Sequence, residues 1–169
     1  SGNIADLPAP PMKTKIIDNL VLGLACPDSR FAEFWISEGL DQSRPWKARW
    51  AMTAYERLRL RCILDAAVAS LYGLDQQDFS FVLKTCDEQR PDIARVDAKG
   101  FWRVDKAKDP ELRHTVLTLV AFHDLEEKIR GCGGDRDKGI EAFLNQNDGE
   151  GWMLPETLRL ADYGLGHDE

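Results

Sequence analysis

The sequence predicts a mainly α-helical fold: a compact domain of about six helices, with room for one short β-hairpin near residues 93–104. Three observations lead to this prediction. Apolar residues recur every three or four positions in several separate segments. Residues that favour helix starts precede these segments, and glycine or proline follows them.

Four segments organise the chain. Residues 1–3, Ser-Gly-Asn, are interpreted as the scar of a cleaved tag. Residues 4–12 are interpreted as an extended lead-in, because prolines fix φ and remove backbone donors. Residues 13–130 are the predicted helical core domain, and residues 131–169 a loop-rich carboxy-terminal extension with short helices.

The composition is that of an ordinary soluble globular protein, with 43% hydrophobic and 30% charged residues in a chain of 169. A chain of this length can bury a core of its own. No apolar run reaches the length of a membrane span, and no signal-peptide pattern occurs. The four cysteines form no C-x-x-C pair, which fits reduced thiols. We therefore expect a cytoplasmic protein with no membrane partner.

Two helices are predicted in the first forty residues. Apolar residues at helical spacing occupy residues 16–24, and Pro27 stops the pattern. Asp28 or Ser29 can cap a second, short helix that ends before Gly39.

The clearest helix start is the pair Thr53 and Glu56, which forms a capping box. The apolar stripe of this helix consists of Leu60, Leu64, Ala67 and Leu71. Gly73 lies at its end, and Asp75 can cap the helix that follows.

The longest helical pattern begins with Asp109 as the cap and Pro110 at the first helical position. Its centre, TVLTLV, is rich in β-branched residues and could be read as a strand. The length, the cap and the stripe of apolar residues favour a helix that ends at Gly131. A glycine-rich loop follows, then a short helix around residues 140–145 and a last helix that starts at Pro155.

No metal centre or catalytic group is predicted. Zinc needs clustered thiolates or imidazoles, whereas the cysteines stand far apart in the sequence. They are Cys26, Cys62, Cys86 and Cys132. His114 and His123 are nine residues apart, so they do not lie on neighbouring turns of one helix face. His123 falls on the apolar stripe and is predicted to be a hydrogen-bonded core residue.

One stretch, PDIARVDAK, has the Pro-Asp and acidic-x-Lys elements of metal-dependent nucleases. In those enzymes two carboxylates hold a divalent ion. Only four residues separate Asp92 from Asp97, which is too few for a strand and a turn between them. A solvated connecting segment is therefore favoured over a nuclease site that would include Lys99.

Charge is distributed unevenly along the chain. The net charge is −7, yet the segment from Arg44 to Arg61 carries +5, so that the remainder carries −12. Its cations are the candidate DNA-phosphate ligands, namely Arg44, Lys47, Arg49, Arg57, Arg59 and Arg61. Its aromatic residues are Trp46, Trp50 and Tyr55. The last three arginines alternate along a helix, about 200° apart, so they cannot all face one surface. Phosphate contact and a solvated or salt-bridged face both stay open.

The series LRLRCILDAAVASLYGLDQQDFSFVLKTC resembles a segment of large adenine-specific DNA methyltransferases of the type IIG restriction–modification and phage-defence kind. The matching motifs are Leu64-Asp65-Ala66, Leu71-Tyr72-Gly73-Leu74 and Val82-Leu83-Lys84-Thr85, in that order. Upstream LPAPP and LVLGLACPDSRFAEF, and downstream KGFWRVDK, DPELRHTVLTLVAFHDL and GEGWMLPETLRLADYGLGHD, also resemble these enzymes. The resemblance covers nearly the whole chain.

The resemblance implies a carboxy-terminal helical domain of such an enzyme, with or without restriction activity in the parent. The chain has no Asn/Asp-Pro-Pro-aromatic loop to receive a flipped adenine. It also has no glycine-containing loop after a strand for S-adenosylmethionine, so that cofactor is expected in the parent and not here. The implied partners are the rest of the parent chain and, weakly, DNA.

An alternative from another class is a protein-interaction module that docks a partner subunit of a bacterial defence complex. Its docking surface would be acidic, with Glu126, Glu127 and Asp135 as candidates.

Overall fold

The structure, a computed structural model, describes residues 15–26, 28–37, 50–85, 107–109 and 112–163. Within these residues it contains six α-helices and no strand, which confirms the predicted mainly α fold. The helices are α1 (Lys15–Ala25), α2 (Ala32–Ser37), α3 (Ala54–Leu71), α4 (Gln76–Thr85), α6 (His114–Gly131) and α7 (Arg136–Gly149). Two short 3-10 turns are η2 (Ser29–Phe31) and η6 (Leu160–Tyr163). The predicted hairpin near residues 93–104 lies outside the described residues.

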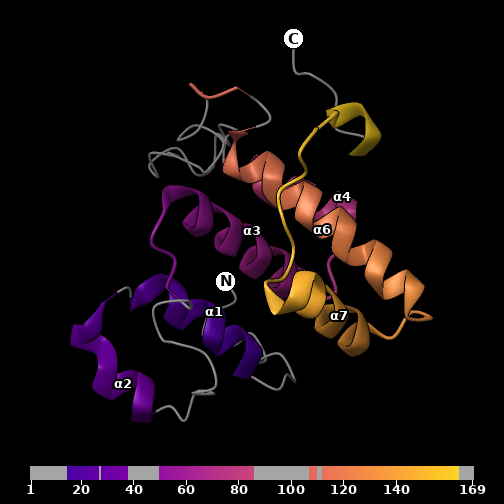
Figure 1. The fold of residues 1–169 in the computed structure, drawn as a ribbon. Helices are drawn as coiled ribbons and strands as arrows, with labels where there is room; N and C mark the ends of the chain where they lie inside the picture. The colour runs from indigo at the N-terminus through magenta and orange to yellow at the C-terminus, as the bar shows by residue number, and fades with distance from the viewer. Residues whose placement is uncertain (1–14, 27, 38–49, 86–106, 110–111, 164–169) are drawn as a thin grey trace, which may run out of the picture.

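Helix α6 is the central element, and α3, α4 and α7 all pack against it (Figure 1). Residues 114–122 are buried without exception, so its first two and a half turns are covered on every side. Leu125 and Ile129 continue the buried face toward the end of the helix. A helix that is buried all round belongs to the interior of a fold and is not a one-sided surface helix.

The main core forms where α3, α4, α6 and α7 meet. Phe79 of α4 packs on Phe122 of α6 with ring centroids 5.0 Å apart. Phe143 of α7 stacks on Trp152 at 6.4 Å. These aromatic contacts add to the burial of aliphatic side chains, which supplies most of the stabilisation of such a core.

A second, smaller cluster lies under α1 and α2. It is made of Leu22, Cys26, Trp35 and Trp50. Helix α1 also packs against α3, which connects this cluster to the rest of the fold.

The capping box predicted for α3 is confirmed. The hydroxyl of Thr53 accepts the backbone N–H of Glu56 at 3.1 Å, and the Glu56 carboxylate accepts the backbone N–H of Thr53 at 2.9 Å. Two amides of the first turn, which no intrahelical carbonyl can reach, are thereby satisfied.

The start predicted for α6 was wrong. Asp109 does not cap it: α6 begins five residues later, and the Asp109 carbonyl closes a separate local turn with the N–H of Leu112 at 2.8 Å. The helix begins at His114, with Arg113 in the capping position and without a side-chain capping bond. Leu112, an apolar residue inside the predicted helix, is 56% exposed.

After Gly131 the structure differs from the prediction in where α7 begins and in the predicted helix at Pro155. Asp135 accepts the N–H of Lys138 at 3.1 Å, so α7 begins at Arg136 inside the expected glycine-rich loop. No helix begins at Pro155, because residues 151–159 are not helical. We call the non-helical residues 151–159 the strap. Trp152 explains its path: the side chain is 3% exposed and is held in the core, which draws the chain across the helices.

Gly139 lies inside α7, where glycine is normally unfavourable. A Cβ at this position would lie 2.6 Å from the Cα and 2.9 Å from the backbone nitrogen of Ile129 in α6. Glycine is therefore required here because the two helix backbones approach each other closely.

We predict that Gly139→Ala lowers the free energy of unfolding by ~1–3 kcal/mol, since backbone atoms of α6 must move to admit the methyl group. The matched control is Gly131→Ala, because a Cβ at Gly131 meets nothing within 4 Å. That variant should be neutral or stabilised by up to ~1 kcal/mol. Urea unfolding of both variants measures the difference, and equal stabilities would contradict the close approach.

Candidate nucleic-acid interface

The six candidate phosphate ligands fall into two groups. Arg44, Lys47 and Arg49 lie outside the described residues. The other three are on α3, where the structure sends them in different directions, as their spacing predicts.

Arg57 is directed toward α1. Its guanidinium donates to the carbonyl of Leu24 at 3.0 Å, in a partly buried contact. Leu24 lies in the last turn of α1, where carbonyls have no intrahelical partner. Arg57 therefore joins α1 to α3.

Arg59 is directed toward the strap that follows α7. One of its terminal nitrogens donates to the carbonyls of Glu150 and, at 3.0 Å, of Trp152. Gly151 lies between these two acceptors with a φ of +83°. Arg59 thus fixes a turn that brings Trp152 into the core.

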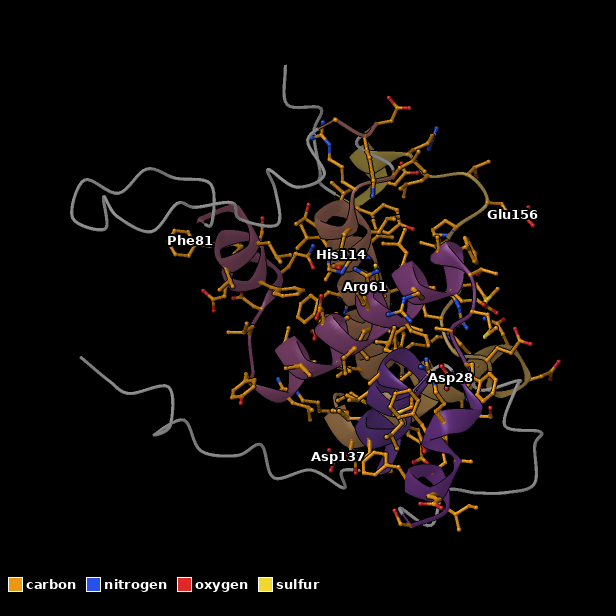
Figure 2. All side chains as sticks on the ribbon, turned by 90° about the vertical axis from the view of Figure 1, so that its left-hand side faces the viewer. Asp28, Arg61, Phe81, His114, Asp137 and Glu156 are labelled. Atoms are coloured by element: carbon orange, nitrogen blue, oxygen red, sulfur yellow. The ribbon has the colours of Figure 1, made fainter. Side chains whose placement is uncertain are left out.

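Arg61 remains at the surface, on the side of α3 that faces the viewer in Figure 2. Its Nε donates to the carbonyl of Arg57, one turn earlier, at 3.3 Å. Within the described part of the chain, no hydrogen bond or ion pair engages its two terminal nitrogens. Of the three arginines on α3, Arg61 is the one whose geometry suits a phosphate group.

Glu56, the acid of the basic segment, completes the capping box of α3. Hydrogen bonds from the backbone N–H of Thr53 hold the pKa of Glu56 below its ordinary value, with smaller contributions from the Thr53 hydroxyl and the N–H of Met52. Because its carboxylate completes the capping box, Glu56 is positioned at the helix end.

The aromatic residues of the basic segment also have different roles. Trp50 is 8% exposed and belongs to the small cluster under α1, so it cannot stack on a base. Tyr55 is 48% exposed at the start of α3. Trp46 lies outside the described residues.

The structure brings together three residues that the sequence did not connect. Nε2 of His114, at the start of α6, lies 3.2 Å from a carboxylate oxygen of Asp65 on α3. The thiol of Cys62 lies 4.0 Å from the carbonyl of His114. No sequence signal could have found this group, because it depends on how two helices pack across a wide gap in the chain.

This group does not form a nucleophilic site. Cys62 is fully buried, and burial raises the pKa of its thiol to about 12, although a hydrogen bond with Thr118 acts in the opposite direction. A thiol that stays protonated at neutral pH is a poor nucleophile. The cluster is therefore part of the α3–α6 packing.

His123 is hydrogen-bonded as predicted, but it is only partly buried and does not belong to the core. Its side chain is 37% exposed, and its Nδ1 lies 3.4 Å from Asp124. The ring of Tyr163 meets it edge-on at 5.1 Å. Asp124 also accepts the indole N–H of Trp152 at 2.7 Å, so these contacts hold the strap onto α6.

Two of the three acids suggested for partner docking have local structural roles. Asp135 caps α7 and pairs with Lys138 at 2.8 Å. Glu127 pairs with Arg130 on the surface of α6. Surface pairs of this kind contribute little to stability, but they reduce the negative charge presented to a partner.

Comparison with protein-family models found no match, and searches of curated proteins and of solved structures found none either. Within the described residues, no group of three His, Cys, Asp or Glu side chains could hold a metal ion. No helix in that same part of the chain is long and apolar enough to cross a membrane.

We predict that Arg59→Ala lowers the free energy of unfolding by ~1–3 kcal/mol, because the partly buried carbonyl of Trp152 and the exposed carbonyl of Glu150 both lose their donor. Arg61→Ala is the control: it removes the same charge from the same helix but no contact to the strap, so stability should change by less than ~0.5 kcal/mol. Denaturant unfolding followed by tryptophan fluorescence measures both. Identical midpoints would show that Arg59 does not fix the strap.

A second prediction concerns alkaline pH. The pKa of Cys62 rises from 9.0, the ordinary value of a thiol, to about 12 in the folded protein. Between these pH values the Cys62 thiol is deprotonated in the unfolded chain and protonated in the folded protein. The contribution of Cys62 to the free energy of unfolding is therefore fully present below pH 9 and decreases as pH rises. The decrease is ~1.4 kcal/mol per pH unit.

The measurement is the free energy of unfolding at a series of pH values above 9. Cys62→Ala should be less stable but should lose stability less steeply with pH. Cys132→Ala, which keeps the buried thiol, should decline as steeply as the unaltered chain. A Cys62→Ala slope equal to that of the unaltered chain would refute the raised pKa.

Proposed function

We propose that this chain is a non-catalytic, carboxy-terminal helical domain of a site-specific DNA N6-adenine methyltransferase. It supports the DNA-recognition region of the parent and contacts DNA phosphates, while S-adenosylmethionine binds elsewhere in the parent. The observation that carries the proposal is the basic segment that leads into α3, with Arg61 exposed on that helix.

The motifs of the family resemblance support this proposal by their positions. Leu64-Asp65-Ala66 lies in α3, Leu71-Tyr72-Gly73-Leu74 makes the turn from α3 to α4, and Val82 and Leu83 lie in α4. Gly73 has a φ of +73°, a conformation that few other residues adopt readily. The motifs therefore fall on elements that build the scaffold, which suits a supporting domain.

The directions of the three arginines on α3 reduce the number of residues that could contact phosphate. Arg57 and Arg59 donate to backbone carbonyls inside the fold. Arg61 is exposed and lies on the helix that the basic segment enters. Phosphate contacts from Arg61 and the cations of the basic segment would orient the domain on a duplex without reading its sequence.

A protein-interaction module is the second candidate. The observation that favours it is α2, which buries Trp35 but leaves Phe34 and Ile36 exposed at 48% and 65%. Exposed apolar groups on one helix are typical of contacts with another protein. Co-purification with a partner, insensitive to DNA and salt, would favour this function over the first.

The test of the proposed function is DNA affinity as a function of salt. Reversal of Arg44, Lys47 and Arg49 to Glu should weaken binding to cognate and unrelated duplexes alike. It should also flatten the plot of log affinity against log salt by ~0.9 for each phosphate that the variant no longer neutralises, because each neutralised phosphate releases counterions.

A matched control removes the same amount of charge elsewhere. Lys128, Arg130 and Arg136 are exposed on α6 and α7, and their reversal to Glu should leave the slope nearly unchanged. If the two triple variants change affinity and salt slope equally, the effect comes from the net charge of the chain and not from phosphate contacts by the basic segment. A change in the recognised sequence would place base readout in this domain and contradict the supporting role.

A further inference from the structure

We draw no further inference here: the strongest candidate, the apolar surface of α2 where Phe34 and Ile36 are exposed, carries no proposal because nothing in the described residues shows what covers it.

Discussion

The complete burial of the first half of α6 is the constraint on which the rest of the fold depends. A helix whose residues 114–122 are all covered needs neighbours on every side, and α3, α4 and α7 supply them. Each neighbour takes its position from this helix. The approach of α7 is so close that Gly139 cannot carry a side chain. Trp152 is then drawn back against α7 and α6, which sets the path of the strap.

The same burial determines the chemistry of the polar groups that α6 carries. The hydroxyls of Thr115 and of Ser70 on α3 are fully buried and have no partner among the described residues, a cost of ~1–3 kcal/mol each that apolar packing must offset. Cys62 lies in these same surroundings, which keep its thiol protonated. The proximity of Cys62, Asp65 and His114 is therefore a consequence of helix packing, although the three residue types together resemble a catalytic set.

Local signals predicted the parts of the fold that depend on local chemistry. The capping box of α3 and the helical nature of TVLTLV follow from neighbouring residues alone, and both are confirmed. Long-range contacts explain the failures. Proline at position 155 favours a helix start, but the anchoring of Trp152 is accompanied by a non-helical strap. Arg59 finds its acceptors 91 and 93 residues away, and no local pattern specifies such partners.

The difference between local signals and long-range contacts matters most for the candidate site, because a count of cations in the sequence treats all arginines alike. A guanidinium can bind a phosphate or satisfy carbonyls at the end of a helix, and its formal charge is the same in both cases. On α3 the carbonyls engage Arg57 and Arg59, so that under the proposed function the candidate phosphate ligands are Arg61 and the three cations upstream of Trp50. At ~0.9 per contact, the salt dependence of DNA binding is then bounded by ~3.6 for four ligands, where six would give ~5.4. The fold therefore sets the electrostatic strength of the proposed interface as much as the composition does.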